Sequence, residues 1–132
     1  MIIFRYKSEK GAHQHLVKRP VAEVWLKNGQ EKIKLHSYID SGADVTLIPF
    51  SLGELLGFKA DKEKTEHLGG ISDGVSVIYK RCQIKIGNCL FPILVAWALS
   101  EDVPVLLGRA GVFDTFDITF KQKEGKIIFM ER

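Results

Sequence analysis

The chain has 132 residues, the length of one domain or of one domain with a short extension. Hydrophobic residues make up 45% and charged residues 27%, a globular balance that excludes a disordered chain. The net charge is +3, and the two signs are interleaved, so no basic stripe indicates nucleic-acid binding. The longest uncharged segment, residues 86–100, is too short to span a membrane, and the N-terminus turns polar too early for a signal peptide. A soluble cytoplasmic protein is therefore expected.

The first third of the chain predicts strands. Residues 2–6 are a short apolar run, whereas the polar residues 7–18 predict a loop. Two alternating segments, residues 21–27 and 32–39, flank Asn28-Gly29, a dipeptide typical of a two-residue hairpin turn. This turn would pair Val24 with Ile33 and Ala22 with Leu35, which gives the hairpin one continuous apolar face.

Two short helices are expected. The first follows Pro49, where Ser51 and Glu54 have the spacing of a capping box and Gly57 ends the apolar pattern. The second spans residues 110–116.

The strands of the second half predict two more hairpins, one at Gly87-Asn88 and one at Glu124-Gly125. In the first of them Cys82 would face Ile93, four strand positions from Cys89. The two sulfurs would then be too far apart for a disulfide, and both cysteines are expected as free thiols.

About ten short strands with one or two helical turns predict an all-β, single-domain fold. We expect residues 1–18 to form an N-terminal strand and loop extension. Residues 19–132 would form the main domain, which includes the C-terminal hairpin.

The segment Tyr38-Ile39-Asp40-Ser41-Gly42-Ala43-Asp44 is the first candidate for chemistry. An apolar strand runs directly into a carboxylate, a hydroxyl and a glycine, and apolar residues resume at Val45. Asp, Ser and Gly are common turn residues, so an ordinary turn is one interpretation. A carboxylate embedded between apolar segments, however, needs partners or a task to compensate its lost hydration.

Two further segments are weaker candidates when taken alone. Leu106-Leu107-Gly108-Arg109 is an apolar strand that ends in Gly-Arg, and it is also compatible with a plain buried strand. Residues 67–75 are rich in glycine at their centre and predict either a mobile hairpin or a long surface turn.

Taken together, and in their order along the chain, the three segments resemble those of the retroviral-type (retropepsin-like) aspartic proteases. The match covers residues 19–116 and includes Arg19-Pro20, which is similar to the start of that family's domain. The resemblance implies a closed, barrel-like β fold equivalent to half of a pepsin-type enzyme. It also implies aspartic endopeptidase activity, with no cofactor and no metal.

In this family two carboxylates share one proton, because like charges so close together cannot both ionise. The chain has one Asp-Ser-Gly segment, so the resemblance implies a homodimer whose single site contains Asp40 of both copies. Peptide or protein substrates and a second copy are the expected partners, with no nucleic acid and no membrane.

The resemblance also assigns roles by position. Asp40, Ser41 and Gly42 match the catalytic segment, and the Ser41 hydroxyl matches a group that bonds across the dimer. Substrate contacts are implied for the cleft and the flap, namely Ala43, Gly69, Gly70 and Ile71. Asp44 and Arg109 match a structural ion pair.

The sequence also contains features that would fit other functions. Gly70, Ser72 and Gly74 fit the spacing of a serine-hydrolase nucleophile, but a strand pattern follows them and no histidine comes later in the chain. His13 and His15 lie in a polar segment and are expected to bind no metal. A non-catalytic dimerisation or peptide-binding module on the same fold stays open as the alternative function.

Overall fold

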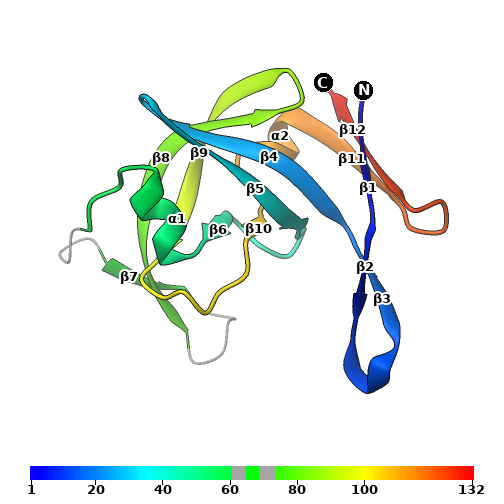
Figure 1. Cartoon of the computed structure of the whole chain (residues 1–132). Helices are drawn as coiled ribbons and strands as arrows, with labels where there is room; N and C mark the ends of the chain where they lie inside the picture. The colour runs from blue at the N-terminus through cyan, green and yellow to red at the C-terminus, as the bar shows by residue number, and fades with distance from the viewer. Residues whose placement is uncertain (61–64, 69–73) are drawn as a thin grey trace.

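The computed structural model describes residues 1–60, 65–68 and 74–132 of the chain (Figure 1). These residues form twelve strands, two short α-helices and one 3-10 turn. The strands are β1 (Ile2–Arg5), β2 (Lys7–Lys10), β3 (Leu16–Arg19), β4 (Val21–Asn28), β5 (Glu31–Ile39), β6 (Thr46–Ile48), β7 (Thr65–Leu68), β8 (Val75–Ile86), β9 (Cys89–Ala98), β10 (Leu106–Leu107), β11 (Phe116–Lys121) and β12 (Lys126–Glu131). The helices are α1 (Phe50–Leu55) and α2 (Val112–Thr115), and the 3-10 turn is η1 (Ala12–Gln14). The predicted all-β class is confirmed.

Six strands close into a barrel. The sheet order is β4-β5-β10-β6-β9-β8, and β4 also pairs with β8, which joins the two ends of the sheet. β7 pairs with the first part of β8 beyond this ring. Closure satisfies the backbone groups that an open sheet would leave unpaired at its edges.

The hairpin of β4 and β5 has a different register from the predicted one. Asn28 pairs with Glu31, so the turn is Gly29-Gln30 and Val24 faces Leu35, not Ile33. Gly29 has a φ of +61°, a left-handed conformation that glycine adopts without steric cost. Because the shift is two residues, each side chain keeps its face, and the predicted apolar face is confirmed.

The hairpin of β8 and β9 has the predicted register. Ile86 pairs with Cys89, and Cys82 pairs with Ile93. Both thiols are free, and Cys82 is buried whereas Cys89 is partly exposed.

Both helices occupy the predicted positions, but the predicted capping box of α1 is wrong. Its N-cap is Pro49, and the Ser51 hydroxyl bonds the Glu101 carboxylate and not the helix backbone. Glu101 also accepts a hydrogen bond of 2.9 Å from the Ser51 backbone N–H. The first turn of α1 is therefore capped by a residue that is distant in the sequence, which a local pattern does not reveal.

A second sheet joins the two ends of the chain. β1 pairs with β12, which pairs with β11, and the N- and C-termini lie side by side (Figure 1). Its inner face adds Phe4 and Phe129 to the core, with their ring centroids 5.1 Å apart.

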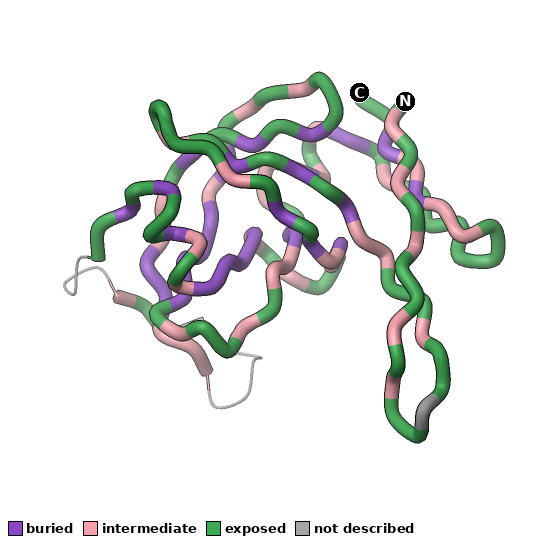
Figure 2. The backbone as a smooth tube through the Cα atoms, viewed as in Figure 1, coloured by how far each residue is buried: buried purple, intermediate pink, exposed green. Residues whose placement is uncertain are grey.

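The loop predicted for residues 7–18 is wrong, because β2 and β3 form an antiparallel hairpin there. We call residues 7–19 the N-terminal arm. The arm projects from the barrel and has no fully buried residue among those described (Figures 1 and 2). Since neither face of the arm is buried, its sequence lacks the alternation of polarity that would reveal strands.

The main core fills the barrel, where the buried residues gather (Figure 2). Trp97 is its largest member, stacks on Phe50 with ring centroids 5.1 Å apart and donates its indole N–H to the Phe50 carbonyl at 2.9 Å. This packing fixes α1 against β9.

Candidate active site

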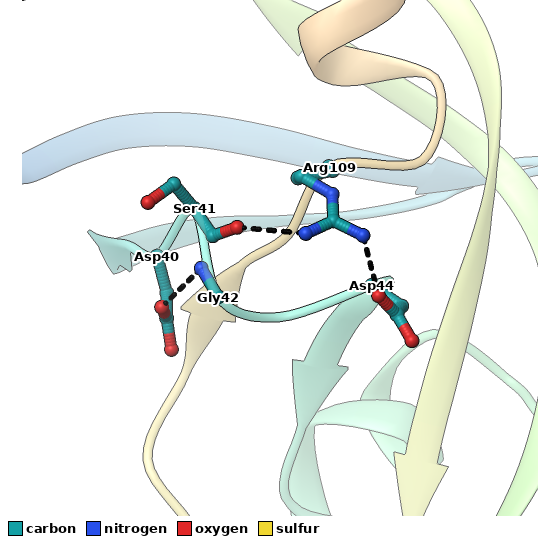
Figure 3. Close-up of polar contacts among 5 residues, drawn as sticks. All are labelled: Asp40, Ser41, Gly42, Asp44 and Arg109. Atoms are coloured by element: carbon teal, nitrogen blue, oxygen red, sulfur yellow. Dashed lines mark hydrogen bonds and ion pairs between the residues drawn. The ribbon is translucent and has the colours of Figure 1, made fainter.

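Asp40 directly follows β5, where the chain leaves the barrel. Ile39 before it is buried, Asp40 is half-buried, and Ser41 and Gly42 are exposed. One carboxylate oxygen of Asp40 accepts a hydrogen bond of 2.9 Å from the Gly42 backbone N–H (Figure 3). A Cβ atom on Gly42 would lie 3.2 Å from this oxygen, so a side chain here would crowd the carboxylate.

β10 and the residues after it bind the backbone of the Asp40 loop. Asp40 donates its backbone N–H to the Leu107 carbonyl at 3.0 Å. On the other side of the loop, Arg109 and Ala110 donate backbone N–H groups to the carbonyls of Ala43 (2.9 Å) and Asp44 (2.8 Å). The loop is thus held at both ends by one neighbouring segment.

Gly108 makes this arrangement possible. It is buried, and a Cβ atom at this position would collide with the backbone of Val45. Its N–H donates to the hydroxyl of the buried Thr46 at 3.2 Å, which ties β10 to β6. Only glycine allows the two backbones to approach this closely.

Arg109 joins the two halves of the loop through its side chain. One guanidinium nitrogen donates to the Ser41 carbonyl at 3.0 Å, and the other contacts the Asp44 carboxylate at 2.6 Å (Figure 3). The planar guanidinium suits such a two-point contact.

A pocket of about 360 Å³ opens beside Asp40. It is lined by Asp40, by Pro20 and by residues of the arm, β5 and the β10 segment, namely Glu9, Arg19, Tyr38, Ile39, Pro104 and Leu106. The pocket combines apolar walls with a few charged groups, a composition typical of ligand-binding sites.

Glu9 is the second carboxylate of this pocket, and it already has partners. The Tyr38 hydroxyl donates to Glu9 at 2.7 Å, and the Arg19 Nε lies 3.7 Å from the other carboxylate oxygen. The hydrogen bond to Glu9, together with burial, raises the pKa of the Tyr38 hydroxyl. The sequence gives no signal for Glu9, because the polar residues around it predict a loop and not a strand beside the site.

The predicted flap residues Gly69, Gly70 and Ile71 lie outside the described residues. The described strands on either side are antiparallel partners, with Leu68 opposite Val75 and Thr65 opposite Ile78. The loop residues Asp40 to Asp44 and the Arg109 segment, in contrast, meet in one site.

The described residues contain no group of three His, Cys, Asp or Glu side chains that could hold a metal ion. No helix in this part of the chain is long and apolar enough to cross a membrane.

No protein-family model and no curated protein sequence match this chain. Solved structures do match. A retropepsin-like aspartic protease from Rickettsia conorii aligns over 97% of this chain and 88% of its own, with a TM-score of 0.63 and 17% identity. The EIAV protease in complex with the inhibitor HBY-793 aligns over 70% of this chain and 83% of its own, with a TM-score of 0.55 and 25% identity. The retropepsin-like fold that the sequence predicts is confirmed.

Proposed function

We propose that this chain, which has the fold of retropepsin-like aspartic proteases, is a homodimeric aspartic endopeptidase. One observation carries the proposal: Asp40 lines a pocket of about 360 Å³ and lies on a loop that the backbone after β10 and the Arg109 side chain hold at both ends. A rigid carboxylate beside a pocket is what general acid–base chemistry on a bound peptide requires.

The second carboxylate would come from a second copy. Within the described residues the pocket contains one other carboxylate, that of Glu9, which Tyr38 and Arg19 already engage. Ser41 and Gly42 are exposed beside Asp40 and leave this side of the loop open to a partner. A two-fold axis at the loop would bring the two Asp40 carboxylates together.

In this dimer one Asp40 carboxylate takes a proton from a water molecule, which attacks the peptide carbonyl carbon. The other Asp40, which holds the shared proton, donates it to the carbonyl oxygen. The first Asp40 then passes its new proton to the amide nitrogen and the C–N bond breaks. A hydroxyl of the tetrahedral intermediate gives its proton to the other Asp40, which restores the shared proton. The pair acts as one unit and titrates as one unit.

The other predicted site residues take supporting roles in the proposal. Ser41 would bond across the dimer, Gly42 and Ala43 would line the cleft, and Gly69, Gly70 and Ile71 would close over the substrate and exclude water. Asp44 and Arg109 would hold the loop without touching the substrate.

Cleavage of a mixed fluorogenic peptide library between pH 4 and 7.5 tests the function. We expect wild-type protein to cleave, and Asp40→Asn to lose at least about a hundredfold in rate, because this change removes the acid–base group. Asp117→Asn is the matched control, since Asp117 is an exposed aspartate whose carboxylate pairs with Arg132 in the terminal sheet.

Equal cleavage by wild-type and Asp40→Asn protein would contradict the assignment of Asp40. If both proteins are folded dimers that bind peptides but cleave none at any pH, the alternative of a non-catalytic binding module takes its place.

A further inference from the structure

A second pocket lies on the outer face of the barrel, on the four neighbouring strands β5, β4, β8 and β9. Its volume is about 550 Å³, and it is lined by Trp25, Lys27, Lys32, Lys85, Asn88 and Leu90. Lys34 lies in the same cross-strand row, directly opposite Trp25. Asp40 is six residues beyond Lys34 along the chain, about 20 Å at the rise of a strand. We call this second pocket the Trp25 pocket.

Positive charge accumulates in the Trp25 pocket at a cost. Lys27 and Lys32 are direct cross-strand partners, and like charges in this position destabilise a sheet. The ammonium groups of Lys32 and Lys34 lie 5.5 and 5.6 Å from the centroid of the same Trp25 ring. Two positive charges therefore lie near one aromatic ring, and a bound anion would reduce the repulsion between them.

Acidic side chains of the protein balance little of this charge. Glu23 lies 3.2 Å from Lys34. Within the described part of the chain, Lys27, Lys32 and Lys85 have no carboxylate within 4 Å. The pocket consequently offers three exposed ammonium groups to an external anion.

Apolar surface accompanies the charge. Trp25 is 37% exposed and Leu90 is 49% exposed. Lys85 pairs with Trp25 on one side and with Leu90 on the other, so the three residues form one cross-strand row. The backbone of β4 is paired on both sides, so a ligand would be recognised through side chains and not by addition of a strand. A ligand that fits must carry both carboxylates and an apolar group.

We propose that the Trp25 pocket binds a short acidic segment of a partner protein, with its carboxylates on Lys27, Lys32 and Lys85 and one apolar side chain against Leu90. The ammonium groups of Lys32 and Lys34 already cover the ring of Trp25, which disfavours the stacked bases of a single-stranded nucleic acid. The inference does not depend on peptidase activity.

The test uses the full chain with Asp40→Asn, so that no probe is cleaved. A dye-labelled peptide Glu-Glu-Leu-Glu-Glu is titrated by fluorescence anisotropy beside Lys-Lys-Leu-Lys-Lys. We expect the acidic peptide alone to bind, with an affinity that falls as salt rises. Trp25 emission should change on binding, whereas Trp97, which is 1% exposed, should contribute no change.

The double variant Lys32→Gln with Lys85→Gln should weaken acidic-peptide binding about tenfold, since two charge-assisted contacts are lost. Lys10→Gln with Lys123→Gln removes the same charge at exposed sites elsewhere and should leave binding unchanged. Equal weakening by both doubles, or equal binding of the basic peptide, would overturn the proposal. Tighter binding of a labelled oligothymidine, lost in the first double variant, would reassign the pocket to nucleic acid.

Discussion

Arg109 illustrates how a single side chain can matter through geometry more than through energy. The side chains of Arg109 and Asp44 are 50% and 82% exposed, and an ion pair this accessible contributes about 0–1 kcal/mol to stability. The same guanidinium also binds the Ser41 carbonyl, so it fixes the direction in which the loop leaves Asp40. We therefore assign it a positioning role.

Cys82 gives a pH-dependent prediction at this scale. Burial raises the pKa of its thiol from 9.0 to about 11, so between these pH values the unfolded chain loses a proton that the folded chain keeps. The resulting stability is fully present below pH 9 and is lost as pH rises toward 11. Between pH 8.5 and 10.5 the free energy of unfolding should fall on the order of 1 kcal/mol more in wild type than in Cys82→Ala.

Urea denaturation of both proteins at both pH values measures the free energies of unfolding. The contributions of the other titrating groups cancel in the comparison, because both proteins contain these groups. An identical pH dependence in the two proteins would show that the buried thiol does not contribute.

At the scale of elements, the segment of β10 and Gly108 supports the Asp40 loop through backbone hydrogen bonds and a close backbone approach. Gly108→Ala should lower the free energy of unfolding by about 2 kcal/mol or more, because the added methyl group collides with the Val45 backbone. Gly42→Ala is the matched comparison, since its Cβ would meet one carboxylate oxygen at 3.2 Å on an exposed loop. Thermal unfolding should show a much larger shift for Gly108→Ala, and equal shifts would argue against the close approach.

Local sequence patterns predicted most of the elements, and the errors have physical causes. The hairpins at Gly87 and Glu124 and both helices follow from turn residues and apolar spacing. The strands of the arm were not predicted because no described residue of the arm is buried. The register of β4 and β5 was wrong because Gly29 can take its positive φ at either central position of a two-residue turn, so Asn28-Gly29 alone does not fix which two residues form the turn.

The candidate site was predicted in part, because local patterns reveal single segments but not the contacts between distant ones. Asp40 and the Arg109 segment stood out because each interrupts an apolar strand, and the parallel pairing of β5 with β10 brings them together. The Glu9–Tyr38 contact joins residues from separate hairpins, and no spacing in the sequence indicates it.

At the scale of the whole molecule, the proposed shared site makes activity depend on both protomers. When wild-type and Asp40→Asn protein are mixed in equal amounts and allowed to exchange partners, about a quarter of the dimers contain two wild-type chains. We expect about half the activity of the same quantity of wild-type protein alone. The reason is that half of the wild-type chains are then paired with inactive partners.

Mixing wild-type protein with an equal amount of Asp117→Asn at the same total concentration is the control. Every dimer is then active, so about twice the activity of the same quantity of wild-type protein alone is expected. If Asp40→Asn has no effect on the wild-type chains, each protomer would have its own complete site. Sedimentation of the mixtures shows in either case whether the chains form dimers.

The pairing of β1 with β12 sets an order on biosynthesis. Among the described strands β1 is synthesised before all the others, and its partner β12 after all the others, with Ile2 opposite Phe129. Until β12 is made, the apolar side chains of β1 have no sheet to join and stay available for non-native contacts while the intervening strands are synthesised. The barrel strands between them can assemble earlier, so the synthesis of β12 is the step that lets the terminal sheet close.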